Sequence, residues 1–400
     1  MQLPVSSSRP VKGQPLPRGP VFGWASFERI NAPNIDSIEH LPHTAFTTSG
    51  RAAIYQALLQ LALPSGSTVL VPSYHCPTMV APVLLANLNV GYFGLRADGL
   101  PNLDSIDHAS AASARAVLVS HYFGFANSLA EVRQWCDARG IALIEDCAHC
   151  YFGNAGDRPV GAWGDYATAS LSKFLPVPEG GLLASARRPI APLKLVRQGF
   201  KAQIKGWVDV FELAAQYKRL TGLNTMLATL FGLKNHLNQT RVVGPAPKSD
   251  DSAAPDASSM MHYSDMARIT LAPLGATSVL RAMLPRGRII AKRQANFATY
   301  ARHFAQVKGA RPLFDLPSTA VAPYVFPLWV DDAESVYREI RALQLPVFRW
   351  DRIWPGTPHL AGDVGPLWSQ HVLQLLCHQD LSTADVANTS QTILKLLSPQ

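Results

Sequence analysis

Three short segments of the sequence carry residues whose types and spacing could do chemistry. Ser49-Gly50-Arg51 opens a run typical of a helix, and the free N–H groups at a helix N-terminus suit a phosphate. Asp146 ends a buried apolar run, where a carboxylate needs a positive partner or several donors. Lys173 lies among apolar residues before Gly180-Gly181. Burial would lower its pKa and make it a nucleophile for an aldehyde.

Each segment also has an ordinary explanation. Many helices begin with Ser-Gly, Asp146 could cap the segment that follows it, and Lys173 could reach from a strand end to solvent.

Cys147-x-x-Cys150 indicates a metal or redox site only weakly, because no second C-x-x-C pair is present. We therefore predict no metal site. The five cysteines, an odd number, favour reduced thiols over a disulfide framework.

The elements that must position these residues alternate between strands and helices. Strands are expected at 68–71, 90–95, 116–121 and 141–144, and helices at 51–59, 78–88 and 128–140. This spacing indicates βαβ units and a mainly parallel sheet. Ligand sites in such sheets lie at the carboxyl ends of strands, which makes the polar residues there candidates. They are Tyr74, His75 and Cys76, then His121 and Tyr122, and then Asp146 to His149.

The remainder of the chain divides into a tail, a helical segment, a loop and a smaller unit. Residues 1–21 are expected to be extended or disordered, and 22–238 to form the large domain. Within it, residues 205–235 predict amphipathic helices with a break at Gly222, more typical of a packing face than of a membrane-surface helix. Residues 239–258 predict a mobile loop.

Residues 259–400 predict the smaller α+β unit. We expect its helices at 274–305, 333–343 and 382–397 and its strand at 324–330. Trp350-Asp351-Arg352-Ile353-Trp354-Pro355 in this unit could line a sugar or nucleotide site, although tryptophans in loops more often anchor packing.

Composition narrows the class of protein. The chain has 400 residues and a net charge of +8, with 48% hydrophobic and 16% charged residues. A chain of this kind should bury a large core. It contains no run of five Lys or Arg and no basic-aromatic stripe, which argues against a nucleic-acid binder. The absence of a long apolar stretch and of a signal-peptide pattern predicts no membrane span and a cytoplasmic location.

The order of phosphate turn, strand-end acid and lysine resembles that of pyridoxal-phosphate (PLP) enzymes. More specifically, the chain resembles the DegT/DnrJ/EryC1/StrS family of sugar aminotransferases from about Trp24 to its end, tightly over 46–185. The matching stretches are Thr48-Ser49-Gly50-Arg51-Ala52-Ala53, Val69-Leu70-Val71-Pro72-Ser73-Tyr74, His121-Tyr122-Phe123-Gly124, Ile144-Glu145-Asp146-Cys147-Ala148-His149, Gly161-Ala162-Trp163-Gly164-Asp165 and Glu179-Gly180-Gly181. The block from acid to lysine is the specific part of this resemblance.

The resemblance implies a fold and a set of residue roles. The fold is an α/β, three-layer large domain around a mainly parallel mixed sheet (PLP transferase fold type I), with a smaller α+β C-terminal domain. Lys173 would form the Schiff base with PLP and move protons, and Asp146 would keep the pyridine nitrogen protonated. His149 would lie beside the cofactor's phenolic oxygen. Ser49, Gly50 and Arg51, together with Ser170, would hold the phosphate.

The chain also departs from the family pattern. The family usually places an aromatic ring over the cofactor at the position of Cys76, so Tyr74, His75 or Cys76 must form that face. The partner-subunit Asn of the family has no counterpart in 261–264, and the segment 200–260 has no clear counterpart. These departures suggest a divergent branch. Some members of the family carry His in place of this lysine and eliminate water instead of transferring an amine. Lys173 argues against membership of that branch.

We therefore predict an aminotransferase. It would move an amino group from glutamate or glutamine to a keto-sugar, with a nucleotide-linked sugar favoured, in polysaccharide or glycan biosynthesis. The active site would lie at a homodimer interface. Two alternatives stay open: a PLP enzyme of another reaction type, and a non-catalytic binding or regulatory protein that keeps the fold.

Overall fold

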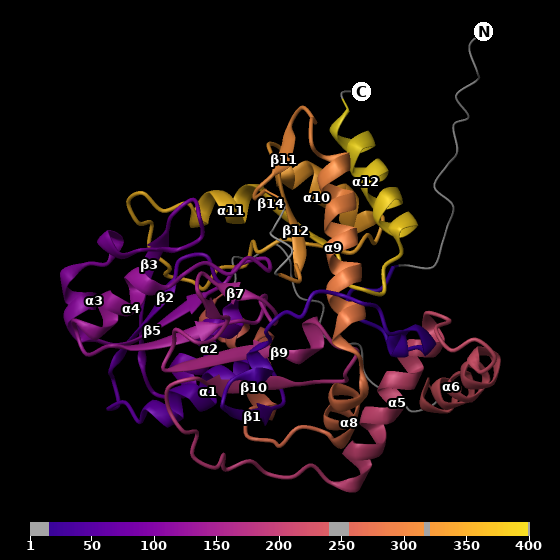
Figure 1. Ribbon diagram of the computed structural model, residues 1–400, viewed down its shortest axis with the longest axis horizontal. Helices are drawn as coiled ribbons and strands as arrows, with labels where there is room; N and C mark the ends of the chain where they lie inside the picture. Colours follow the sequence, from indigo (N-terminus) through magenta and orange to yellow (C-terminus); the bar gives the residue numbers. More distant parts are fainter. Residues whose placement is uncertain (1–15, 240–255, 316–320, 399–400) are drawn as a thin grey trace.

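The computed structural model describes residues 16–239, 256–315 and 321–398. Most of the residues predicted to form the mobile loop, and most of the N-terminal tail, lie outside these ranges. Within them the chain forms an eight-stranded sheet, a four-stranded sheet and a two-stranded hairpin. The large sheet and its helices make up the body of the molecule, and the small sheet lies above it (Figure 1).

The eight-stranded sheet is mixed and mostly parallel, as predicted. Its strands are β1 (His43–Thr47), β2 (Thr68–Pro72), β3 (Asn89–Leu95), β4 (Pro101–Asn102), β5 (Ala114–Ser120), β6 (Ala142–Asp146), β9 (Tyr166–Ser170) and β10 (Gly181–Ser185). They lie in the order β1-β10-β9-β6-β5-β2-β3-β4. The central pairs from β3 to β9 are parallel, whereas β4 at one edge and β10 and β1 at the other pair antiparallel.

Alternating side chains bury both faces of this sheet. In β2, Leu70 packs in one core cluster while Val69 and Val71 pack in another. In β5, Val117 and Leu118 divide between the same two clusters. Such a strand must be covered on both sides, which explains the three layers.

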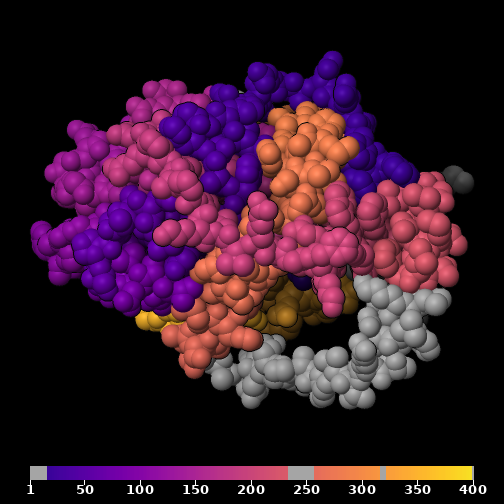
Figure 2. All heavy atoms as spheres, turned by 90° about the horizontal axis from the view of Figure 1, so that it is seen from below, coloured from indigo at the N-terminus to yellow at the C-terminus, as the bar shows by residue number. Residues whose placement is uncertain are grey.

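Short helices connect and cover the strands. Those of the large unit are α1 (Gly50–Leu61), α2 (Pro77–Leu85), α3 (His108–Ser113), α4 (Ala130–Asp137), α5 (Phe200–Gln216) and α6 (Asn224–Gln239). The predicted helices at 51–59, 78–88 and 128–140 correspond to α1, α2 and α4. The predicted amphipathic segment is the pair α5 and α6, which meet at Gly222, a glycine with φ of +90°. Viewed from below, this pair lies at one edge of the molecule (Figure 2).

The face that α5 and α6 turn outward is partly apolar. Phe200 is 79% exposed, and Ile204, Met226 and Leu230 are exposed as well. The inner side chains of α5, such as Val210 and Ala214, are buried in a small cluster with Phe22. The inner face of this pair therefore packs against neighbouring segments, as predicted. The described residues identify no partner for the outer apolar side chains.

The C-terminal part contains the four-stranded sheet, in the order β11-β12-β14-β13. Its strands are β11 (Ala310–Pro312), β12 (Val325–Val330), β13 (Val347–Phe348) and β14 (Val372–Leu376), and the hairpin of the large unit is β7 (Asn154–Ala155) with β8 (Arg158–Pro159). Its helices are α7 (Ala257–Tyr263), α8 (Gly275–Met283), α9 (Arg286–His303), α10 (Ala333–Ala342), α11 (Gly365–His371) and α12 (Thr383–Leu397). The domain boundaries themselves stay a prediction.

One expected helix is divided in two. The sequence predicts a single helix over 274–305, but α8 ends at Met283 and α9 begins at Arg286. Pro285 is the extended residue before α9 and has no N–H to continue α8. The break allows α8 to lie against α5 while α9 runs up to the small sheet (Figure 1).

All five cysteines are free. Cys147 and Cys150 are fully buried behind β6, and only Cys76 reaches the cavity described below. No helix in the described ranges combines the length and the apolar character that crossing a membrane requires.

Candidate active site

A cavity of about 400 Å³ lies at the carboxyl ends of β2, β5 and β6. Eight of the ten predicted site residues line it: Ser49, Gly50, Arg51, Cys76, Asp146, His149, Ser170 and Lys173. They come from sequence positions more than 120 residues apart, and the topology brings them together because parallel strands end at the same edge. Tyr74 and His75 do not line the cavity.

Lys173 lies in this cavity, partly exposed, at the end of the short 3-10 helix η4 (Leu171–Lys173) that follows β9. Burial lowers the pKa of its amine, and the nearby Asp146 carboxylate and Cys76 thiol oppose that shift. No described residue accepts a hydrogen bond from Nζ, which lies 5.1 Å from the centre of the Tyr324 ring. An amine with a lowered pKa has a larger neutral, nucleophilic fraction at neutral pH.

Asp146 ends β6 and faces the same cavity. Its Oδ1 accepts a hydrogen bond from the N–H of Ala148 at 3.0 Å. This bond caps the segment after Asp146, which is the ordinary structural role that the sequence allows for this residue. Its Oδ2 receives only a long bond, 3.3 Å, from the Ser120 hydroxyl. Burial raises the pKa of Asp146, and Lys173 acts against that rise. The carboxylate therefore has capacity left for a positively charged donor.

His149 lines the cavity as a neutral ring. Its Nδ1 accepts a hydrogen bond from the N–H of Phe123 at 3.3 Å, which leaves the proton on Nε2. Burial and the neighbouring Lys173 hold its pKa well below the usual value for histidine. The ring stacks on Tyr324 with centroids 4.3 Å apart and contacts Trp350 at 4.9 Å.

The Ser49 turn forms a cup at the start of α1. The Ser49 hydroxyl caps the helix by accepting from the N–H of Ala52 at 3.3 Å, and Ser170 lies beside Gly50. A Cβ on Gly181 would lie 2.0 Å from the Ser49 carbonyl, so only glycine permits this approach of β10. Arg51 forms an ion pair with Asp265 at 3.2 Å.

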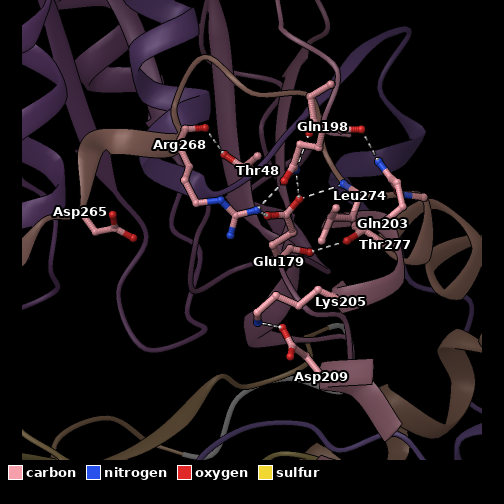
Figure 3. Close-up of polar contacts among 12 residues, drawn as sticks. Thr48, Glu179, Gln198, Gln203, Lys205, Asp209, Asp265, Arg268, Leu274 and Thr277 are labelled. Atoms are coloured by element: carbon pink, nitrogen blue, oxygen red, sulfur yellow. Dashed lines mark hydrogen bonds and ion pairs between the residues drawn. The ribbon is translucent and has the colours of Figure 1, made fainter. Parts of the chain in front are cut away.

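Glu179 ties a distant segment to this cup (Figure 3). Its carboxylate forms an ion pair with Arg268 and accepts from Gln198 at 2.9 Å and from the N–H of Leu274 at 2.8 Å. The Arg268 carbonyl in turn accepts from the hydroxyl of Thr48 at 2.9 Å. Glu179, Asp265 and Arg268 all line the cavity, and the sequence pattern predicts no role for any of them.

We expect Glu179→Gln to destabilise the fold by about 2 kcal/mol. The glutamine carbonyl oxygen can still accept from Gln198 and the N–H of Leu274, but its NH2 group cannot accept, so the charged bond to Arg268 is lost and two donors face each other. Urea unfolding measures the effect. Asp209→Asn, which removes the exposed pair with Lys205 drawn in the same view, is the control and should cost about 0.5 kcal/mol or less. Equal losses in the two variants would contradict the role given to Glu179.

Tyr74 and His75 lie in the core instead of over the cavity. Tyr74 is fully buried among aromatic rings, including Tyr122 at 5.5 Å and Trp350 at 5.2 Å. The His75 ring bonds to the Pro72 carbonyl and accepts from the N–H of Trp354, and burial lowers its pKa to about 4. Of the three residues expected to form the cofactor face, only Cys76 reaches the cavity. The aromatic residue that lines it is Trp350, which the sequence placed in a possible sugar or nucleotide site.

Arg293 on α9 holds the backbone of the lysine turn. Its fully buried guanidinium donates to the carbonyls of Lys173, Pro323 and Tyr324 and to the Gln379 side chain, and it stacks over Phe174 at 4.4 Å. Burial lowers its pKa to about 10, so it stays charged at neutral pH. This one side chain joins the lysine turn of the large sheet to the start of β12.

A buried His121–Glu145–Cys147 group is the candidate metal cluster within the described residues. Glu145 already accepts from His121 at 3.0 Å and from the N–H groups of Gly161, Trp163 and Gly164. These donors stabilise the carboxylate and leave it no vacant position for an ion. The group is structural.

The site residues fit a PLP-type cofactor. The cavity combines an amine with a lowered pKa and no hydrogen-bond acceptor, a carboxylate with spare capacity and a helix-start cup that suits a phosphate. An aldehyde, a protonated ring nitrogen and a phosphate are the groups that such a set would hold.

The fold is that of solved sugar-aminotransferase structures. A DegT/DnrJ/EryC1/StrS aminotransferase from Brucella abortus superposes with a TM-score of 0.59 at 14% identity, covering 90% of this chain and 87% of that one. The predicted α/β class, with its large mixed sheet, is thereby confirmed.

Part of the sequence matches a family model. Residues 34–211 match the model of the DegT/DnrJ/EryC1/StrS aminotransferase family, which confirms the resemblance over that segment. The GDP-perosamine synthase of Vibrio cholerae is 27% identical over 186 residues, 45% of this chain and 50% of its own length. The L-glutamine:2-deoxy-scyllo-inosose aminotransferase of Streptomyces kanamyceticus is 26% identical over 46% of this chain and 50% of its length. The chain spans about half the length of these curated relatives.

Proposed function

We propose that the protein is a PLP-dependent aminotransferase that moves an amino group from glutamate or glutamine to a keto-sugar, with a nucleotide-linked sugar favoured. The observation that carries the proposal is the meeting of Lys173 and Asp146 in one cavity beside the Ser49 cup. The matching family and the names of the relatives support the reaction and the substrate class. A homodimer, a cytoplasmic location and a role in polysaccharide or glycan biosynthesis are further parts of the proposal.

Each residue has a task in this reaction. Bound PLP would supply an aldehyde for amines and an electron-withdrawing ring. The Ser49, Gly50 and Ser170 cup would hold its phosphate, with Arg51 adding charge. Asp146 would accept a hydrogen bond from the ring nitrogen and keep that nitrogen protonated. His149 Nε2–H would donate a hydrogen bond to the ring's oxygen. Neutral Lys173 would anchor the cofactor, then take and return the proton at the substrate carbon that bears nitrogen.

The amino-donor half-reaction tests the proposal. Purified protein reconstituted with PLP should convert glutamate or glutamine to its keto acid in a stoichiometric amount, with a change in cofactor absorbance. Addition of a suitable keto-sugar should restore the first spectrum. Cofactor binding without this discharge would favour the non-catalytic alternative. Discharge that only keto acids reverse would favour an enzyme of another specificity.

A further inference from the structure

The aromatic ring of Tyr324 lies against the amine of Lys173. The Nζ atom is over the face of the ring, 5.1 Å from its centre. An ammonium within about 6 Å of a ring centroid is attracted by the electron density of that face. Asp146 attracts the same amine through its charge, but it forms no hydrogen bond with Nζ. The ring face is therefore the contact that holds this amine within the described part of the chain.

The position of the Tyr324 ring is fixed by its surroundings. Its N–H, directly before β12, donates to the carbonyl of Phe123 at 3.0 Å, and its carbonyl accepts from the buried Arg293 at 3.3 Å. The Phe174 ring packs beside it at 6.1 Å. Because Arg293 also donates to the carbonyl of Lys173, one guanidinium fixes the backbone of both the ring and the amine. The fold thus sets the distance between them.

The same ring holds a second residue of the candidate site. His149 stacks on Tyr324 with ring centroids 4.3 Å apart and an angle of 25° between the planes. His149 follows β6 whereas Lys173 follows β9, and neither is bonded to the other. Their contacts with one fixed ring place the imidazole and the amine relative to each other.

The Tyr324 ring stays neutral. The titratable groups that act on the amine or on the ring are Cys76, Asp146, His149, Arg293 and Cys377. Burial raises the pKa of the Tyr324 phenol, and it raises that of the Cys377 thiol to about 12. Since the phenol keeps its proton at neutral pH, the ring attracts the amine through its π face and not as a phenolate.

We propose that Tyr324 is a positioning residue for Lys173, whose ring face binds the protonated amine and holds it in the cavity until the proton is lost. The attraction needs the positive charge, so it ends when the amine gives its proton to solvent. The neutral amine that can attack an aldehyde is thereby released. The role of the released amine rests on the proposed function, whereas the contact between ring and ammonium does not.

A series of aromatic replacements at position 324 tests the proposal. Phenylalanine and its singly, doubly and triply fluorinated forms keep the shape of the ring, while fluorine withdraws electron density from its face. The pKa of the Lys173 amine is measured in the full-length, cofactor-free protein from the pH dependence of its acetylation by acetic anhydride, read by peptide mass spectrometry. A weaker face destabilises the ammonium, so each fluorine should lower this pKa, by about 0.5 to 1 unit over the series. Tyr324→Phe alone should change it by less than about 0.3 unit, because the π face remains.

The same fluorinated residues at position 326 are the matched control. Phe326 lies on β12, fully buried among the rings of Phe297, Tyr300 and Phe304, and makes no printed contact with Lys173. The pKa of the amine should not change in this second series. A flat series at 324, a rise, or an equal fall at both positions would overturn the proposal. The acetylation uses no cofactor and the glutamate half-reaction uses the unmodified protein, so this proposal and the proposed function can fail separately.

Discussion

Replacing Lys173 by alanine is expected to reduce amino transfer by at least about 1,000-fold. No other amine among the lining residues of the cavity can replace it. The variant loses both the covalent anchor for the cofactor and the base that moves the proton. Its cofactor would remain held without a covalent bond, by the proposed phosphate cup, Asp146 and His149. Single-turnover discharge with glutamate measures the loss.

Borohydride reduction gives a readout that does not depend on turnover. It should fix the cofactor onto Lys173 in the unmodified protein, detectable as a mass shift of the peptide that contains this residue, and fix none in the alanine variant. Lys173→Arg keeps a positive charge without a nucleophilic amine and should behave like alanine. Lys205→Ala, at an exposed position, is the control and should match the unmodified protein. Fixation on another lysine, or undiminished discharge, would disprove the assignment.

Asp146→Asn is expected to reduce amino transfer by about 100- to 10,000-fold. Asparagine keeps the shape and can still accept from Ala148, but it carries no charge to keep a ring nitrogen protonated. Ser120→Ala is the graded control, because it removes the 3.3 Å bond to Oδ2 and a weak 3.5 Å bond to the Met79 sulfur but leaves the Asp146 charge, and it should lower the rate by less than about tenfold. Comparable losses from the two substitutions would argue against a charge-based role.

The same substitution should also shift a pH profile in a known direction. In the unmodified protein the Asp146 carboxylate stabilises protonated Lys173 and so raises its pKa against burial. Removing that charge lets the pKa of Lys173 fall further. The rate of cofactor attachment, which needs the neutral amine, should therefore begin to rise at a lower pH in Asp146→Asn. A shift to higher pH, or no shift, would contradict the coupling between the two residues.

The strands and most helices follow from local pattern. The apolar runs before Pro72 and Asp146 are short and β-branched, and each is buried on both faces, so they predict central parallel strands without knowledge of their neighbours. The helix of 274–305 was predicted as one because its apolar spacing continues across Pro285. The helix is interrupted because Pro285 has no backbone N–H, and the packing of α8 against α5 determines the direction in which α8 leaves this break.

The predicted site residues also fall into two groups, those that the local sequence identifies correctly and those that it places wrongly. Lys173, Asp146 and the Ser49 turn are identifiable because each is an unusual residue type at a predictable strand or helix end. Tyr74 and His75 are also polar residues that directly follow a predicted strand, yet their side chains lie in the core. A residue type and its position relative to a strand end do not specify which way the side chain turns after the strand, since the packing of Trp350 and Trp354 determines it.

The sequence by itself thus determined the class of the sheet, the edge at which the polar residues gather and the amine, the acid and the Ser49 turn that meet there. The tertiary structure alone decided which distant side chains complete the site: Arg268 against Glu179, Arg293 behind Lys173 and Trp350 as the aromatic wall. The physical reason is the range of the interactions. Hydrophobic periodicity acts between residues a few positions apart, whereas these ion pairs, hydrogen bonds and ring contacts join segments about 90 to 280 residues apart, and only the folded chain brings them within reach.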